Sequence, residues 1–392
     1  MLDNLSQWLL THYGKEQFTP GPERMALALM PLKHKFKDSR IVTIAGTNGK
    51  GETTLRLSQY LHEHSHCTWT SPHIERITER FRSEEGEISL DELEALIQAC
   101  HEYALAHSFK LSYYEFLFFV FCTWASEKSP EFLLLEVGLG GRLDAVNFFD
   151  AEVVLLPSVS RDHQEILGNR YDLILKEKLG VLRPGSLLIS FLDLFYLRER
   201  TRTQAHAIGA RLIDLADKSK IPGENFSHRN QFLAYAAYLS LTGQAVNYEN
   251  WNPEENSLEH RGEVVAGRAL WTLFGSHNVD GMRKLIQFLS SEIYNSSRPS
   301  FDAVIVAFSQ RPPNDLVVML KMIKASGFKN VKVTCFKHPK AASREMMEGL
   351  VRKEGLEFVD DIDSYVQGTN SGKVLVTGSY YFLGYIKSIL RC

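Results

Sequence analysis

A lysine among closely spaced glycines follows an apolar, β-branched run near residue 45. The segment reads IVTIAGTNGKGETT over residues 41–54. Glycines let backbone N–H groups approach phosphate oxygens, a following helix N-terminus adds positive potential, and the lysine reaches the β and γ phosphates. The common pattern G-x-x-x-x-G-K-[ST] fails at two positions, because Ile44 replaces its first glycine and Gly51 its hydroxyl. The segment predicts a phosphate site, and a glycine-rich turn without a ligand remains the alternative.

A second pattern that could carry chemistry is HEHSH, residues 62–66, which matches the zinc-binding pattern H-E-x-x-H. That pattern binds zinc when both histidines lie on one face of a helix. Here it closes the helix predicted after the glycine-rich turn and is followed at once by the strand-like run CTWTS. No downstream histidine has a convincing spacing, so we expect no zinc site.

The elements that must position these residues alternate along the chain. Short β-branched runs such as RIVTIAG, EFLLLEVG and AEVVLLP are separated by segments of helical period, including residues 50–64, 90–107 and 113–126. This alternation predicts a parallel sheet covered by helices. A polar, proline-containing stretch, NYENWNPEENSLEHRG, precedes a second alternating series. We therefore expect two α/β domains, residues 1–255 and 256–392.

Composition narrows the class of protein. The 392 residues carry 44 Lys and Arg against 47 Asp and Glu, a formal charge of -3, so no basic field indicates nucleic acid or membrane binding. Five scattered cysteines without a CxxC pair fit reduced thiols. The N-terminal segment lacks the pattern of a signal peptide, and no apolar run is long enough to span a bilayer. We expect a cytoplasmic protein.

Several segments together resemble the folylpolyglutamate synthase and dihydrofolate synthase family, relatives of the Mur ligases. The variant phosphate loop AGTNGKG is accompanied, in order, by FTPGPERM (18–25), SPHIERITERF (71–81), LEVGLGGRLDAVN (135–147), DHQEILG with LKEKLGVLRPG (162–185), GSHN (275–278) and TGSYYFLG (377–384). The resemblance implies a P-loop ATP-binding domain with a parallel sheet, followed by a smaller Rossmann-like α/β glutamate-ligase domain. It implies an ADP-forming ligase of folate biosynthesis that joins L-glutamate to a dihydropteroate or folate carboxylate through an acyl phosphate.

The resemblance also assigns residues in the first domain. ATP would be held by the loop residues Gly46, Thr47, Asn48, Gly49, Lys50 and Gly51. Ser71, Glu136 and His163 resemble ligands of magnesium, of which two ions are expected. Acyl phosphate formation needs such a cation, since it offsets charge on the phosphate oxygens. Lys178 resembles the lysine that CO₂ converts to a carbamate, an anion that would hold a second metal ion or orient its ligands. With Lys50, Glu136 and His163 it completes the catalytic set.

Substrate contacts are implied in both domains. Arg142 and Asp144 would lie on the loop that faces the pterin-type substrate, although a surface ion pair between them is the alternative. In the second domain, Arg261 resembles an arginine that reaches ATP across the interdomain cleft, and His277 and Ser379 resemble glutamate contacts. Arg261 could equally be a solvated charge and Ser379 a helix N-cap. The expected partners are small molecules only, bound by a monomer.

The chain departs from the family pattern at three nucleotide-related positions. Glu52 stands where Ser or Thr is usual, Phe274 replaces a carboxylate, and Phe232 replaces an asparagine. Glu52 either weakens ATP binding by like charge or points away from the phosphates and only favours the helix N-terminus. A binding paralogue without turnover and a Mur-type ligase for another carboxylate therefore remain alternatives. The sequence does not separate dihydrofolate synthase from polyglutamylation activity.

Overall fold

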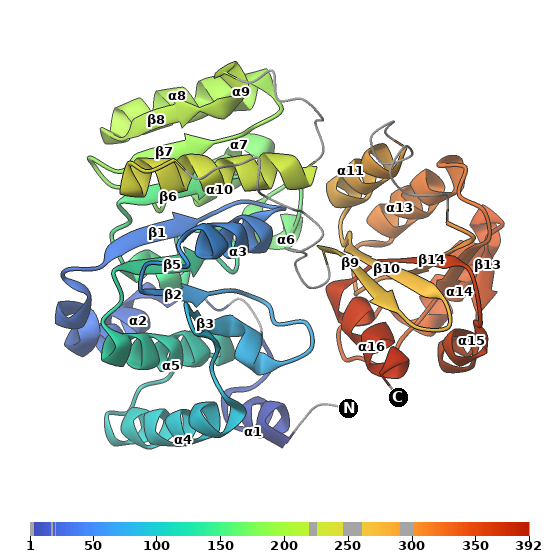
Figure 1. Cartoon of the computed structure of the whole chain (residues 1–392), viewed down its shortest axis with the longest axis horizontal. Helices are drawn as coiled ribbons and strands as arrows, with labels where there is room; N and C mark the ends of the chain where they lie inside the picture. The colour runs from blue at the N-terminus through green and yellow to red at the C-terminus, as the bar shows by residue number, and fades with distance from the viewer. Residues whose placement is uncertain are drawn as a thin grey trace. The chain divides into compact units, whose positions relative to one another are not determined.

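The chain forms two compact units, Met1–Val246 and Asn247–Cys392. The computed structural model describes residues 4–16, 19, 21–218, 226–245, 261–290 and 301–391. The boundary predicted near residue 255 lies outside these described residues. Figure 1 traces both units from the N-terminal blue to the C-terminal red.

The first unit is built on an eight-stranded sheet with the order β4-β3-β2-β5-β1-β6-β7-β8. Strands β2, β5, β1, β6, β7 and β8 pair in parallel, and β3 and β4 extend the sheet antiparallel at one edge. The strands are β1 Arg40–Ile44, β2 His66–Trp69, β3 Phe81–Ser83, β4 Gly86–Glu87, β5 Phe132–Glu136, β6 Val153–Leu156, β7 Leu187–Ser190 and β8 Arg211–Asp214.

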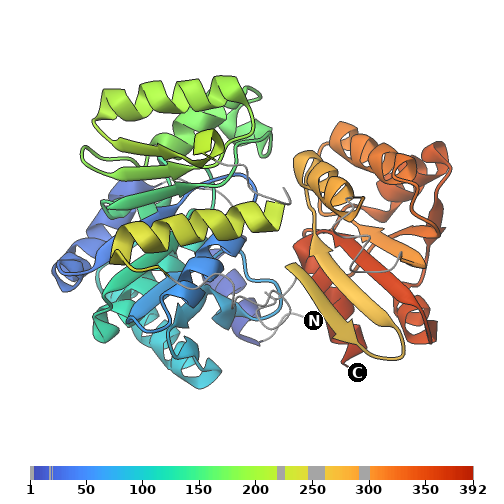
Figure 2. The ribbon, with the colours of Figure 1, turned by 45° about the horizontal axis from the view of Figure 1, so that its top comes forward.

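Helices cover both faces of this sheet. They are α1 Asn4–Tyr13, α2 Pro22–Leu29, α3 Lys50–Tyr60, α4 Leu90–Ala106, α5 Tyr113–Lys128, α6 Gln164–Leu167, α7 Tyr171–Leu179, α8 Phe195–Ile208, α9 Leu215–Lys218 and α10 Phe226–Thr242. Short 3₁₀ turns occupy Met30–Phe36, Ile77–Arg80 and Ala145–Phe148. Figure 2 shows α3 and α10 side by side, which places residues near 50 beside residues near 230.

The alternation of side chains along the strands explains the two covered faces. Leu133, Leu135 and Leu156 join the core that contains the apolar side of α5 and α7. Their neighbours Leu134 and Leu155 are equally buried but lie outside that core, as expected for residues that alternate across a strand. Helix α3 contacts β1, β2 and β5, and α10 contacts β6 and β7. A strand buried on both faces reads as a continuous apolar run, which is why EFLLLEVG lacks polar alternation.

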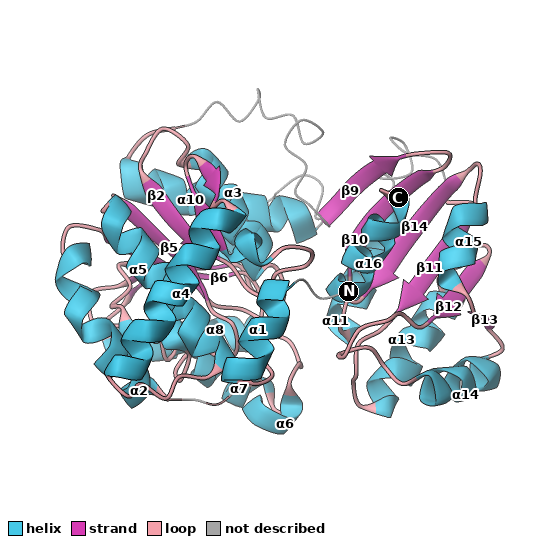
Figure 3. Cartoon of the chain, turned by 90° about the horizontal axis from the view of Figure 1, so that it is seen from below, coloured by secondary structure: helices cyan, strands magenta, loops and turns pink. Residues whose placement is uncertain are grey.

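The second unit carries a six-stranded sheet with the order β13-β12-β11-β14-β10-β9. All of its pairs are parallel except β10 with β9. Figure 3 shows β9 and β13 at opposite edges. The strands are β9 Arg261–Ala266, β10 Leu270–Gly275, β11 Ala303–Ala307, β12 Val331–Thr334, β13 Glu357–Val359 and β14 Lys373–Gly378. The helices are α11 Val279–Leu289, α13 Pro313–Ala325, α14 Arg344–Glu354, α15 Ile362–Gly368 and α16 Tyr380–Leu390.

These sheets confirm the predicted α/β class in both units. The run EVVAGRALWTLFG, at the start of the second alternating series, forms a hairpin of β9 and β10 that turns between Ala266 and Leu270. Helix α3 ends at Tyr60, so the HEHSH pattern is not helical, and His66 lies in β2. In the part of the chain that the structure describes, no helix has both the length and the apolar character to cross a membrane.

Candidate active site

The phosphate loop connects β1 to α3 at the carboxyl end of the sheet. Ala45 donates its N–H to the Leu155 carbonyl at 2.9 Å, so the loop leaves the sheet beside β6. Gly49 has φ +87 and sits at the N-terminus of α3, a conformation that L side chains rarely adopt. Lys50 begins the helix, and its Nζ donates to the Thr47 carbonyl at 3.2 Å. The Lys50 side chain therefore reaches back to the backbone of its own loop.

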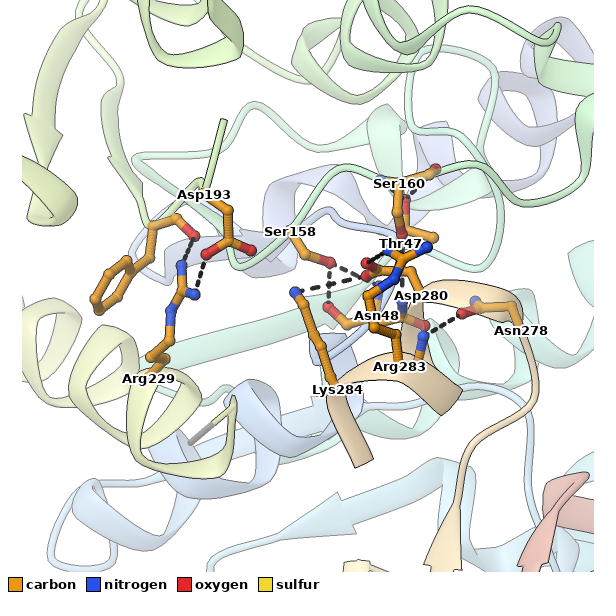
Figure 4. Close-up of polar contacts among 12 residues, drawn as sticks. Thr47, Asn48, Ser158, Ser160, Asp193, Arg229, Asn278, Asp280, Arg283 and Lys284 are labelled. Atoms are coloured by element: carbon orange, nitrogen blue, oxygen red, sulfur yellow. Dashed lines mark hydrogen bonds and ion pairs between the residues drawn. The ribbon is translucent and has the colours of Figure 1, made fainter. Parts of the chain in front are cut away.

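Two serines that follow β6 hold the loop from the side (Figure 4). The Ser158 hydroxyl accepts the Asn48 N–H and donates to the Asn48 carbonyl, both at 2.8 Å. Thr47 Oγ1 donates to the Ser160 carbonyl and accepts the Ser160 N–H, both at 3.0 Å. Because these bonds fix the loop without a ligand, the arrangement is preorganised.

Lys178, on α7, lies directly under this loop. It is buried, and its Nζ donates to the Gly46 carbonyl at 2.8 Å. Burial, assisted by the charge of Lys50, lowers the pKa of Lys178 from 10.5 to about 7. A substantial neutral fraction at physiological pH makes the amine nucleophilic, which is what carbamate formation requires.

Ser71 and Glu136 come together at the ends of neighbouring strands. Glu136 ends β5, and Ile44, the last residue of β1, is its partner in the parallel register. The Ser71 N–H, just beyond β2, donates to Glu136 Oε2 at 3.1 Å. The Ser71 hydroxyl oxygen is buried and has no hydrogen-bond partner among the described residues. A carboxylate and an unsatisfied hydroxyl thus lie beside the phosphate loop, a donor set of oxygens that suits Mg²⁺.

His163 lies beyond β6 in the left-handed conformation, with φ 48, directly before the short helix α6. Its side chain is about half exposed, 3.7 Å from Glu165 measured from Nδ1 to Oε1. The neighbouring Asp162 is buried and accepts the His163 N–H at 3.0 Å. Within the described ranges, no group of three His, Cys, Asp or Glu side chains gathers as a metal site. The predicted magnesium site therefore also needs the hydroxyl of Ser71 and a carbamylated Lys178 as ligands.

The loop after Glu136 assigns different environments to Arg142 and Asp144. Arg142 is half exposed and forms an ion pair with Glu177 at 2.9 Å. The alternative, an ion pair between Arg142 and Asp144, is therefore not observed. Asp144 is buried and accepts N–H groups of the loop and the Tyr114 hydroxyl, the latter at 3.1 Å. Burial raises the pKa of Asp144 to about 6. This carboxylate shapes the loop from within.

In the second unit, predicted residues lie at the carboxyl ends of β10 and β14. The His277 ring lies 5.4 Å from the Tyr380 ring, between centroids. The Ser379 hydroxyl is 2.6 Å from that of Ser309, and its side chain makes no N-cap bond to α16. The alternative role of Ser379 as a capping side chain is therefore not observed. Arg261 begins β9, and its side chain lies outside the described part of the structure.

Known proteins resemble this chain in sequence and in fold. No protein-family model matches the chain. Dihydrofolate synthase/folylpolyglutamate synthase of Bacillus subtilis (strain 168) is 26% identical over 425 residues, which cover 97% of both chains. The enzyme of the same description from Escherichia coli (strain K12) is 31% identical over 189 residues, 46% of this chain and 43% of the relative.

Solved structures show the same fold. The bifunctional folylpolyglutamate synthase/dihydrofolate synthase of Yersinia pestis, complexed with AMPPNP and a Mn ion, superposes with a TM-score of 0.79 at 24% identity, covering 99% of this chain and 98% of that one. Escherichia coli FolC with DHPP and ADP gives 0.78 at 22% identity, with 99% and 97% covered. Over almost its whole length, the chain is therefore similar to the dihydrofolate synthase/folylpolyglutamate synthases.

One structural residue of this site, Tyr114, was not predicted from the sequence. Tyr114 is buried in α5, and its hydroxyl accepts the Trp69 Nε1–H and the Gly138 N–H, both at 3.2 Å, while it donates to Asp144. It joins the ends of β2 and β5, next to Ser71 and Glu136. No local pattern in the sequence reveals these partners, which are 24 and 45 residues away.

The three departures from the family pattern have distinct settings. Glu52 is 4% exposed, and its carboxylate is bound by α10. Phe274 is buried against Phe288, with ring centroids 5.7 Å apart. Phe232 lies 6.5 Å from the Phe191 ring, in an edge-on arrangement. The two phenylalanines thus extend apolar packing at positions where polar side chains were expected.

Proposed function

We propose that this chain is an ATP-dependent, ADP-forming ligase that joins L-glutamate to the carboxylate of dihydropteroate or a folate. The observation that carries the proposal is the neighbourhood of the phosphate loop. Strands β2, β5, β1 and β6 are adjacent and parallel, and their carboxyl ends present Ser71, Glu136, the loop and His163 in that order. Ligands of open parallel sheets bind at this edge. Relatives solved with AMPPNP and Mn, or with DHPP and ADP, have the same fold.

The reaction follows from phosphoryl and acyl transfer. A carboxylate oxygen attacks the γ-phosphorus of ATP, the bond to the β-phosphate oxygen breaks, and ADP leaves. The glutamate amine then attacks the acyl carbon, the C–O bond breaks, inorganic phosphate departs and the amine proton passes to solvent. The loop N–H groups and Lys50 hold the phosphates, and cationic groups stabilise the oxyanion of the second step.

The residues present fit a divalent cation beside the phosphates. Glu136, the unsatisfied hydroxyl of Ser71 and His163 would hold Mg²⁺, which supplies charge compensation on the phosphate oxygens. We infer two ions, with Lys178 carbamylated. The neutral Lys178 amine attacks CO₂, an N–C bond forms, and one proton is released to solvent. The pKa of about 7 favours this reaction.

The proposal extends to the substrate contacts. Arg142 is exposed enough to meet a pterin-type substrate, whereas Asp144 would act through the shape of its loop. His277 and Ser379 would contact glutamate from the second unit, and Arg261 would contact ATP. The expected protein is a cytoplasmic monomer whose partners are small molecules.

The fate of one oxygen atom tests this chemistry. Dihydropteroate labelled with ¹⁸O in its carboxylate is incubated with ATP, Mg²⁺ and L-glutamate, and mass spectrometry measures the ¹⁸O content of the products. The acyl phosphate route transfers one labelled oxygen to inorganic phosphate and forms dihydrofolate. Phosphate without label would refute the route. The same label in a tetrahydrofolate acceptor reports the polyglutamylation activity separately.

A further inference from the structure

Glu52 lies in the first turn of α3, yet its carboxylate is directed to another helix. Asn230 of α10 donates its Nδ2–H to Glu52 Oε2 at 2.7 Å, and the Ser227 hydroxyl donates to Oε1. Both Glu52 and Asn230 are buried, at 4% and 6% exposure. A buried carboxylate is stable only where donors meet it, so both oxygens are committed to α10.

The same asparagine touches the phosphate loop itself. A Cβ atom added to Gly49 would lie 2.5 Å from Asn230 Oδ1, closer than real Cβ contacts allow. The amide therefore packs directly against the loop glycine that adopts φ +87. One side chain thus holds both the turn of the loop and the first turn of the helix that follows.

Other contacts fix α10 to the sheet independently of the loop. Arg229 forms an ion pair with Asp193 and donates to the Phe191 carbonyl at 3.0 Å (Figure 4). These bonds anchor α10 to the chain just beyond β7, so α10 can support the elements that pack against it. The phosphate loop is one of these elements.

We propose that Glu52 and Asn230, here called the loop clasp, are positioning residues that hold the phosphate loop in its nucleotide-binding shape. Glu52 then acts on ATP through loop geometry and not as a charge facing the phosphates. One of the departures from the family pattern, Glu52, is a member of this contact. The proposal rests on the proposed function only in that the loop binds a nucleotide.

An exchange of the two functional groups tests the clasp. Asn230→Asp places two carboxylates together and should weaken ATP binding by about tenfold or more, since like charges in a buried site repel. Glu52→Gln added to Asn230→Asp restores one amide and one carboxylate with their places exchanged. This double variant should recover ATP affinity to within about threefold of the wild type, as coupled neighbours do. Titration calorimetry with ATP and Mg²⁺ measures each dissociation constant without acceptor or glutamate.

A matched control separates loop positioning from general stability. Ser58, at the far end of α3, bonds His66 Nε2 at 2.7 Å, and Ser58→Ala should lower the melting temperature without changing ATP affinity. In steady-state assays the Asn230→Asp change should appear mainly in KM for ATP. Unchanged affinity in Asn230→Asp, or no recovery in the double variant, would overturn the clasp. Tighter ATP binding by Glu52→Ser would also overturn it, because the carboxylate would then face the phosphates.

The same titrations keep the two proposals distinguishable. A wild type that binds ATP with the expected variant pattern but forms no amide product supports the clasp and removes the ligase proposal. A wild type that forms the amide while Asn230→Asp binds ATP normally removes only the clasp. A wild type that binds no ATP refutes both.

Discussion

Replacing Lys178 by methionine is expected to stabilise the protein against unfolding at neutral pH while abolishing the proposed ligase activity. The methionine side chain has similar length and no charge to desolvate. Lys178 is buried under the phosphate loop, where its Nζ donates to the Gly46 carbonyl at 2.8 Å. Loss of activity follows because neither an amine nor a carbamate remains.

The expected change in the free energy of unfolding follows from the pKa of Lys178. Burial and then Lys50 lower the pKa of Lys178 from 10.5 to about 7, which costs the folded state roughly 5 kcal/mol at pH 7 or below. The unfolded chain binds more protons than the folded one between pH 7 and 10.5, so stability rises with pH across that window. Subtracting about 1 to 2 kcal/mol for the carbonyl that loses its donor leaves a gain of about 3 kcal/mol for Lys178→Met at pH 6.5. The gain should fall to about zero near pH 9.5 and become a loss of about 1 to 2 kcal/mol above pH 10.5.

Urea unfolding of the wild type and Lys178→Met at pH 6.5 and 9.5, in buffer free of CO₂, measures these differences. Lys176→Met, an exposed position on the same helix, is the matched control and should change stability little at either pH. A variant less stable than the wild type at pH 6.5 would refute the view that Lys178 is a desolvated amine. An advantage that stays constant between the two pH values would refute it as well.

Two further predictions concern the edge of the first sheet. Glu136→Ala and His163→Ala should each abolish Mg²⁺-dependent turnover with little loss of folded structure by circular dichroism; full activity in both variants would remove the metal assignment. Tyr114→Phe should destabilise the first unit by about 2 to 4 kcal/mol in urea unfolding, because the Trp69 and Gly138 N–H groups lose a buried acceptor. Unchanged stability would show that these donors find water instead.

Much of the architecture was accessible from local patterns. The apolar runs and helical periods predicted the alternation of strands and helices, and the glycine-rich turn was expected where β1 meets α3. The hairpin of β9 and β10 falls within one run, EVVAGRALWTLFG, whose turn near Gly267 is short. Periodicity alone does not reveal where such a run reverses.

The partners of individual side chains were less accessible, since they depend on contacts distant in sequence. Glu52 was considered only beside phosphates or at a helix N-terminus, whereas its partner Asn230 is 178 residues away. Arg142 and Asp144 were predicted to lie together on a loop that faces the substrate, with an ion pair between them as the alternative. The fold separates them, giving one to Glu177 and burying the other beside Tyr114.

The most direct test of the account is the release of ADP from ATP by the purified wild type. The assay is run with Mg²⁺ and either dihydropteroate or tetrahydrofolate, each with and without L-glutamate. We predict sustained ADP release only when an acceptor and glutamate are both present, in equal amounts with the amide product. No ADP release under any of these conditions, or release independent of both substrates, would contradict the assignment as a ligase.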